Sequence, residues 1–109
     1  MISSSRIQNF LCDVKHADFI DFVPTEKNRK TLYILGLTFH DMEDIIRNLK
    51  VTEYHSGPLS DYDLSRTGQI WIFKHKHEHH VLYIKIKEVI IVEEKKRVKC
   101  LSCHIDFMI

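Results

Sequence analysis

LYIKIK, residues 82–87, and RVKCLSCHIDF, residues 97–107, are the two stretches that decide the fold. Apolar and polar side chains alternate through both, which is the period-two pattern of half-buried β-strands. The charged run EEKK, residues 93–96, separates them and predicts a turn with its tip at residues 94–95. We therefore expect an antiparallel hairpin with one dry face and one solvated face.

Counting from that tip predicts the partners across the hairpin. In an antiparallel hairpin the numbers of two facing residues always add up to the sum for the two residues at the tip, here 94 and 95. Lys85 is therefore expected to face His104 on the solvated side. The other pairs expected there are Tyr83 with Asp106, Lys87 with Ser102 and Val89 with Cys100. The dry face is expected to pair Leu82 with Phe107, Ile84 with Ile105 and Ile86 with Cys103. A slip of one residue would move His104 among the aliphatic side chains, so the pattern argues against it.

Size and composition indicate an ordinary globular protein. The chain has 109 residues, of which 44% are hydrophobic and 28% charged, and we expect one domain over residues 1–109. The formal net charge is only +1, so a nucleic-acid site would have to arise from local clustering of basic residues. No stretch is long and apolar enough to cross a bilayer, and charged residues interrupt the region where a signal peptide needs an apolar core. We expect a cytoplasmic protein without a membrane partner.

The three cysteines, Cys12, Cys100 and Cys103, are an odd set without the spacing of a disulfide framework. Free thiols are the simplest interpretation. Cys100 and Cys103 form a C-x-x-C motif, but on the expected strand their sulfurs point to opposite faces. That geometry favours plain packing over a redox or zinc role.

The N-terminal half predicts mostly helix. Three helices are expected, over residues 3–14, 25–35 and 38–49, with a short strand at 19–23 and one further helical turn at 52–54. Serine or threonine stands at each helix start, where its side chain can cap the first turn. Gly36 supplies the left-handed end of the second helix.

The C-terminal half predicts a loop followed by strands. HSGPLSDYDLSRTG, residues 55–68, contains two glycines, a proline and almost nothing to bury, which is typical of a long loop. QIWIFK, residues 69–74, predicts a strand, which the histidine-rich segment 75–80 joins to the strand that contains Tyr83. The element order indicates an α+β protein, with N-terminal helices packed on one side of a small antiparallel β-sheet.

The solvated face of the expected hairpin carries groups that are suited to cleaving RNA. Cleavage without a metal requires a base for the ribose 2′-hydroxyl, an acid for the leaving 5′-oxygen and positive charge beside the phosphate. His104 suits proton transfer and Lys85 suits charge stabilisation, while Tyr83 can stack on a base and Lys87 extends the basic strip. The alternative is an ordinary solvated sheet face, because any such face alternates polar residues.

Three further residues are candidates for the site. His55, at the start of the expected loop, is either a second titratable group or an ordinary surface residue. Arg66, in the same loop, is a candidate substrate contact. Trp71 lies in a strand that is apolar on both faces, so packing is the stronger interpretation and contact with RNA the alternative.

KHKHEHH, residues 74–80, contains four histidines, three of which would suffice to hold zinc. The intervening lysines and the position at a hairpin tip instead favour an exposed turn. We expect neither a metal nor a cofactor.

Two other functional classes are weighed against an enzyme. Helices 26–35 and 39–49 resemble a helix-turn-helix in outline, but the second, FHDMEDIIRNL, is acidic and poorly suited to DNA. A non-catalytic module that binds a protein along an edge strand is the other alternative.

The chain resembles the MqsR family of toxins from bacterial type II toxin–antitoxin systems, over roughly residues 19–106. The stretches that carry the resemblance come in the family's order and spacing: EKNRKTLYILGLT (26–38), DIIRNLKVTEYHSGPLSDYD (44–63), GQIWIFK (68–74), LYIKIK (82–87) and VKCLSCHID (98–106). The resemblance implies a metal-independent mRNA endoribonuclease, or mRNA interferase, with a RelE-like α+β fold. Its implied partners are mRNA, either free or at the ribosome, and a cognate antitoxin protein.

The resemblance also implies site residues. Tyr83 and Lys85 match the family's Tyr-x-Lys strand, which is part of its proposed active site. His104 matches the histidine of a terminal Ser-Phe-His, with Cys103 in place of phenylalanine. The implied reaction is attack of the 2′-hydroxyl on the adjacent phosphate, which leaves a 2′,3′-cyclic phosphate and a 5′-hydroxyl.

Two positions depart from the family's pattern. His55 stands where the family commonly has lysine, and Ile72 stands where one branch has a glutamine of its proposed catalytic set. The function of that glutamine must be absent here or be supplied by another group.

Overall fold

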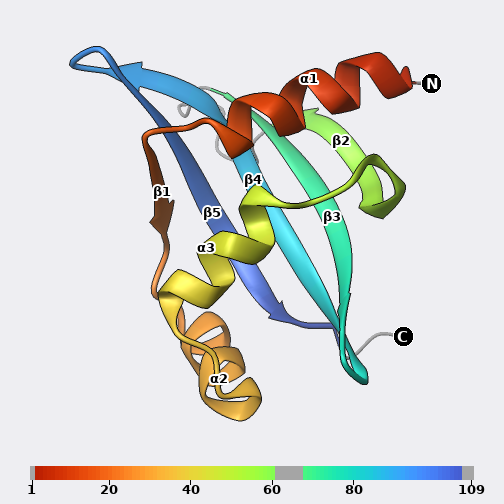
Figure 1. Ribbon diagram of the computed structural model, residues 1–109, viewed down its shortest axis with the longest axis vertical. Coiled ribbons are helices and arrows are strands. Elements are labelled where there is room, and N and C mark those ends of the chain that lie inside the picture. The colour runs from red at the N-terminus through yellow and green to blue at the C-terminus, as the bar shows by residue number, and fades with distance from the viewer. Residues whose placement is uncertain (1, 61–67, 107–109) are drawn as a thin grey trace.

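The computed structural model of the chain describes residues 2–60 and 68–106 (Figure 1). Arg66 and Phe107, with the contacts predicted for them, lie outside these ranges. In chain order the described elements are α1 (Ser4–Lys15), β1 (Phe19–Phe22), α2 (Glu26–Leu35), α3 (Phe39–Arg47), the 3₁₀ turn η1 (Val51–Glu53), β2 (Tyr54–Ser60), β3 (Gln69–His77), β4 (His80–Val92) and β5 (Lys95–Ile105).

The described strands form one mixed sheet in the order β1-β5-β4-β3-β2. The sheet is mostly antiparallel, and β1 pairs parallel with β5 at its edge. Figure 1 shows α1 and α3 crossing one face of the sheet, whereas α2 lies beyond the end of β1, next to β5. The α+β prediction is confirmed. Strand β1 was predicted at residues 19–23, but its parallel pairing with β5 was not, because four residues carry no local signal for the strand that they will join.

The predicted helices are confirmed, and so are their end signals. Gly36 ends α2 in the left-handed conformation, with φ of 67°. The helix starts are capped by side-chain oxygens that accept backbone N–H groups: Ser3 from Arg6, Thr25 from Asn28 and Thr38 from Asp41. No helix among the described residues is long and apolar enough to span a membrane.

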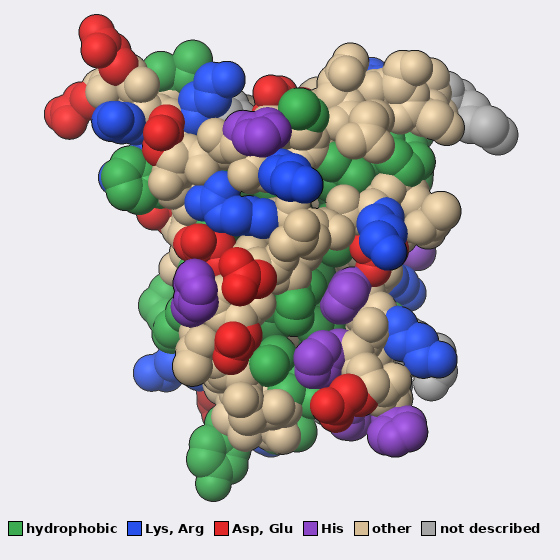
Figure 2. All heavy atoms as spheres, in the orientation of Figure 1, with side chains coloured by type: hydrophobic (Ala, Val, Ile, Leu, Met, Phe, Trp, Pro, Cys, Tyr) green, Lys and Arg blue, Asp and Glu red, His purple; other side chains and the backbone are tan. Residues whose placement is uncertain are grey.

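The hydrophobic core lies between α1, α3 and the facing side of the sheet. The ring of Phe10 from α1 stacks on Trp71 from β3, with 4.4 Å between centroids. Trp71 is only 2% exposed, so the packing interpretation is confirmed and its role as a substrate contact does not fit this position. Figure 2 shows the outer surface on the helical side, where acidic and basic side chains are interspersed rather than gathered by sign.

Residues 82–87 and 102–105 of the β4–β5 hairpin lie on the predicted faces, but the predicted register is wrong. Tyr83 pairs with His104, and Lys85 pairs with Ser102 rather than with His104. The cause is a two-residue turn in which Glu93 and Glu94 both have positive φ, of 51° and 66°. Turns of that kind favour Gly and Asn, so two glutamates gave no signal for it. The other observed pairs are Leu82 with Ile105, Ile84 with Cys103, Ile86 with Cys100 and Lys87 with Lys99.

A β-bulge at Leu101 brings both cysteines of the C-x-x-C motif to the dry face, contrary to the prediction. Consecutive residues of β4 pair with Ser102 and then with Cys100, so Leu101 is an extra residue in β5. Both thiols are fully buried. Their mutual hydrogen bond, together with burial, raises the pKa of the Cys100 thiol.

Part of the predicted long loop is instead the edge strand β2. Tyr54–Ser60 pairs antiparallel with β3, with two irregularities in the register. Gly57 approaches β3 so closely that a Cβ atom there would lie 2.6 Å from the carbonyl oxygen of Ile70. An irregular edge strand buries few side chains, which is why the polar composition of residues 55–60 concealed it.

Replacing Gly57 by alanine should lower the free energy of unfolding by about 2–3 kcal/mol, because the new methyl group meets β3 and φ is +117°. Gly36→Ala is the matched control: φ is also positive, but nothing lies within 4 Å of the added Cβ. It should cost only about 1 kcal/mol. Urea unfolding measures both, and equal losses would contradict the close approach of β2 to β3.

Candidate functional site

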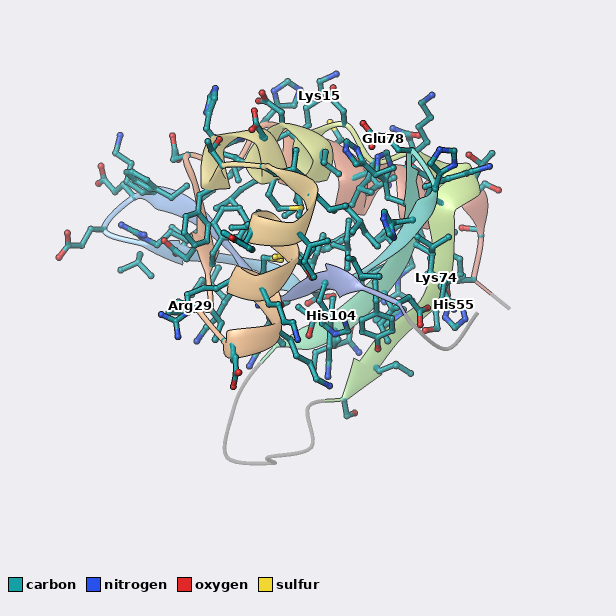
Figure 3. All side chains as sticks on the ribbon, turned by 90° about the horizontal axis from the view of Figure 1, so that it is seen from below. Lys15, Arg29, His55, Lys74, Glu78 and His104 are labelled. Carbon is teal, nitrogen blue, oxygen red and sulfur yellow. The ribbon has the colours of Figure 1, made fainter. Side chains whose placement is uncertain are left out.

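A row of three side chains crosses the face of the sheet opposite α1 and α3. His104 of β5 pairs with Tyr83 of β4, which pairs in turn with Lys74 of β3. The rings of Tyr83 and His104 stack, with 5.4 Å between centroids and 21° between planes. Figure 3 shows His104 and Lys74 on the side of the sheet away from those two helices. We call His104, Tyr83 and Lys74 the central row.

Asp106 holds one end of the central row in place. Its carboxylate lies 3.0 Å from the ammonium of Lys74, and its side chain is only 7% exposed. Its backbone N–H donates to the carbonyl oxygen of Val81. Asp106 was predicted to pair with Tyr83 of β4, but it forms an ion pair with Lys74 of β3 instead. This ion pair holds the Lys74 ammonium in position at the end of the central row.

Lys85 follows Tyr83 by two residues in β4, so its side chain lies on the same face of the sheet, next to the central row. It faces Ser102 on β5 and Ile72 on β3, so it is a diagonal neighbour of His104 rather than its direct partner. Diagonal neighbours in a sheet are about 7–8 Å apart, within reach of a long side chain. Lys87 follows at the next position, where its side chain packs against Gly68.

Strand β3 gives the same face an apolar floor. Ile70 and Ile72 are buried and lie directly opposite Lys87 and Lys85. Ile72 occupies the position where the resemblance implies glutamine, so no polar group is supplied there. Among the described residues, the site therefore consists of an apolar strip, Ile70 and Ile72 of β3, with Lys87 and Lys85 beside it on β4. The central row lies at the end of this strip.

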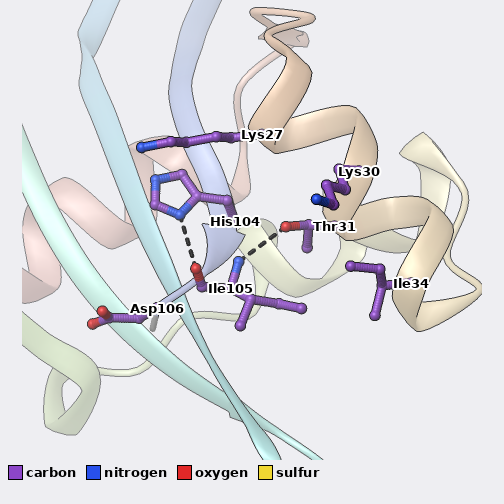
Figure 4. Close-up of a pocket in the computed structure, with 7 residues that line it drawn as sticks. All are labelled: Lys27, Lys30, Thr31, Ile34, His104, Ile105 and Asp106. Atoms are coloured by element: carbon purple, nitrogen blue, oxygen red, sulfur yellow. Dashed lines mark hydrogen bonds between the residues drawn. The ribbon is translucent and has the colours of Figure 1, made fainter. Parts of the chain in front are cut away.

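A hydrogen bond sets the protonation pattern of His104. Its Nδ1–H donates to the carbonyl oxygen of Ile105, at 3.1 Å (Figure 4). Because a carbonyl oxygen can only accept, Nδ1 carries the proton and Nε2 of the neutral ring keeps a lone pair. The half-buried imidazole thus presents a nitrogen that can take a proton from a nearby hydroxyl group.

Two buried side chains of α2 hold the strand segment on either side of His104. The side-chain amide of Asn28 donates to the carbonyl oxygens of Val23 and Leu101, at 2.8 and 3.2 Å, and its Oδ1 accepts the N–H of Cys103 at 3.0 Å. Thr31 Oγ1 accepts the N–H of Ile105 at 3.0 Å. Strand β1 pairs with β5 only as far as Cys100, so these groups take the place of a neighbouring strand.

A pocket of about 370 Å³ lies on the α2 side of His104 (Figure 4). Its lining comes from α2 and from the end of β5: Lys27, Lys30, Thr31, Ile34, His104, Ile105 and Asp106. Sequence reasoning missed Lys27 and Lys30, because no local pattern says that α2 lies beside β5. It also missed Lys74, which a two-residue turn at 78–79 places opposite Tyr83. Glu78 in that turn has positive φ and, like Glu93 and Glu94, gave no signal for it.

The remaining predicted residues lie apart from the central row. His55 is exposed on β2, with its Nδ1 3.1 Å from Ser56 Oγ, and β3 stands between it and Tyr83. The histidines of segment 75–80 lie at the β3–β4 hairpin, where His75 hydrogen-bonds to Glu53. Within residues 2–60 and 68–106, no group of three or more His, Cys, Asp or Glu side chains is arranged to hold a metal ion.

Comparison with known proteins adds no assignment. No protein family matches the chain, and neither a curated protein nor a solved structure matches it. We therefore base the function on the residues and their geometry.

Removing the Asn28 side chain should show how firmly α2 holds β5. Asn28→Ala leaves the buried Cys103 N–H and Leu101 carbonyl without their partner, so we expect a loss of about 2–4 kcal/mol in unfolding free energy. Hydrogen exchange should accelerate most at the Cys103 amide. Asn48→Ala is the control, because that exposed amide donates only to Asp44 of its own helix. It should cost under about 1 kcal/mol, and equal effects of the two changes would refute the bracing role.

Proposed function

We propose that the protein is a metal-independent endoribonuclease that cleaves mRNA, and that it is the toxin of an MqsR-like type II toxin–antitoxin system. The observation that carries the proposal is the central row, in which His104 presents the lone pair of Nε2 beside Tyr83. Lys74 and Lys85 lie on the same face of the sheet, which none of the described helices covers. Helices on one face of a small sheet and a solvated opposite face support a RelE-like arrangement.

The proposed reaction begins at the ribose. His104 Nε2 takes the proton of the 2′-hydroxyl, and the 2′-oxygen attacks the adjacent phosphorus. The bond between phosphorus and the 5′-oxygen then breaks, and the electron pair stays on that oxygen. Tyr83, which stacks on His104, supplies the proton that the 5′-oxygen takes up. The products are a 2′,3′-cyclic phosphate and a 5′-hydroxyl.

The lysines act on the phosphate. Negative charge builds on the non-bridging oxygens as the 2′-oxygen attacks, and fixed cations stabilise it without having to move. Lys85 is assigned to this role, because it lies diagonal to His104 over the apolar floor. Lys87, one same-face position further, extends the basic strip along the RNA.

A non-catalytic interaction module remains the second candidate function, and one observation favours it. The end of β4 exposes three aliphatic side chains next to the Glu93–Glu94 turn, and Ile91 is 70% exposed. In a toxin the same surface suits a cognate antitoxin, so the two functions differ in whether RNA is cleaved. DNA binding gains no support, because Arg47 of α3 donates to the carbonyl oxygens of Lys15 and Ala17.

Single substitutions in the site should slow cleavage strongly. His104→Ala and Lys85→Ala should each slow the cleavage of RNA by about a hundredfold or more, because each removes a group that acts on the reacting atoms. His40→Ala and Lys96→Ala, at exposed positions away from the site, should keep the full rate. Cleavage is measured with purified protein, and mass spectrometry should find a 2′,3′-cyclic phosphate end.

Three outcomes would count against this assignment. Full cleavage by both site variants would remove His104 and Lys85 from the mechanism. Loss of cleavage by the wild-type protein in a chelator would show that a metal is required. Absence of cleavage of any RNA, with a partner still bound, would favour the interaction module.

Tyr83→Phe should separate stacking from proton donation. Phenylalanine keeps the ring that stacks on His104 but lacks the hydroxyl, so the rate constant of cleavage in single-turnover experiments should fall by about tenfold or more. Tyr33→Phe is the control, because Tyr33 is fully solvated on α2. An unchanged rate for Tyr83→Phe would limit Tyr83 to orienting the imidazole.

A further inference from the structure

We infer that the pocket between α2 and the end of β5 is a nucleotide subsite. A base of single-stranded RNA packs there against Ile34 and Ile105, and Lys27 and Lys30 bind its phosphate. The position of this nucleotide next to the scissile phosphate rests on the proposed ribonuclease function. None of these four residues was assigned a role from the sequence.

The walls of the pocket suit a flat, partly apolar group. Ile34 from α2 is 48% exposed and stands at the pocket, while Ile105 from β5 is buried behind it. A volume of about 370 Å³ falls at the lower end of small-molecule sites, which span about 300–1,000 Å³. Proteins that read single-stranded RNA place unstacked bases on such surfaces.

The charges in the pocket suit an anion. Lys27 and Lys30 are three residues apart on α2, so they lie on one side of the helix. Neither takes part in an ion pair with any of the described residues. Among the described residues that line the pocket, Asp106 is the one carboxylate, and it forms an ion pair with Lys74. The two lysines of α2 therefore leave the pocket with a net positive charge.

The pocket adjoins the proposed chemistry through His104, which belongs both to its lining and to the central row. Figure 4 shows the Lys27 side chain running alongside the His104 ring, on the side away from the bond between Nδ1 and Ile105. A phosphate at Nε2 would thus have Lys85 on the sheet side and Lys27 on the α2 side. Single-stranded RNA that crosses His104 would place successive nucleotides over the sheet and in the pocket.

Reversing the charge of single residues on α2 tests whether Lys27 and Lys30 bind RNA. Lys27→Glu and Lys30→Glu should each weaken binding of a 2′-O-methyl RNA dodecamer, which cannot be cleaved, by about tenfold or more. Arg29→Glu is the matched control: it makes the same change of charge on the same helix, but Arg29 does not line the pocket and points away from His104 in Figure 3. Equal weakening by all three variants would overturn the subsite, because it would reflect general attraction alone.

NMR spectra of the backbone amides of the full chain test whether the pocket binds the base of a nucleotide. Uridine or adenosine 3′-monophosphate should shift the amides of Thr31, Ile34 and Ile105, whereas inorganic phosphate at the same concentration should leave Ile34 and Ile105 unmoved. Identical shifts with inorganic phosphate would reduce the pocket to a simple anion site and overturn the proposal. Shifts with polyglutamate but not with nucleotides would overturn it in favour of an acidic protein partner.

The same samples separate the two proposals. If RNA is cleaved and the KM values of Lys27→Glu, Lys30→Glu and Arg29→Glu are the same, the ribonuclease stands and the subsite falls. If no RNA is cleaved but nucleotides shift Ile34 and Ile105, the nucleotide site stands and the ribonuclease falls.

Discussion

The hydrogen bonds from Asn28 and Thr31 to β5 are the constraint on which the rest of the structure depends. Beyond Cys100 none of the described strands pairs with this edge of β5, and buried backbone groups there must find other partners. Two side chains of α2 supply them, at the N–H groups of Cys103 and Ile105. The same bonds brace the residues on either side of His104, bring α2 next to β5 and form the pocket between them.

The division of the sheet into two unlike faces explains how a nearly neutral chain can build a basic site. The dry face packs against α1 and α3, and the opposite face gathers Lys74, Lys85 and Lys87 on adjacent strands. Buried Ile70 and Ile72 lie beside Lys87 and Lys85 on the neighbouring strand, and charges next to an apolar surface interact more strongly than charges surrounded by water. A net charge of +1 is therefore compatible with a local cluster of basic side chains.

The errors of sequence reasoning share one origin. Helix ends followed from residues that cap within three or four positions, and the faces of residues 82–87 and 102–105 followed from alternation, so both were predicted correctly. The register of the β4–β5 hairpin depended on two glutamates with positive φ, and the faces of the two cysteines depended on a bulge at Leu101. A turn or bulge of that kind is stabilised by contacts elsewhere, and it leaves little trace in the local pattern.

Where no bulge interrupts a strand, the sequence by itself determined which residues share the solvated face, because period-two alternation assigns each side chain to one side whatever its partner. Tyr83, Lys85 and His104 were placed together for that reason. Only the tertiary structure decided that His104 stacks on Tyr83, that Lys74 completes the row and that Lys27 and Lys30 border the imidazole. Those contacts join different segments of the chain. Their geometry depends on how the strands pair and on how α2 supplies hydrogen-bond partners to the buried backbone groups of β5.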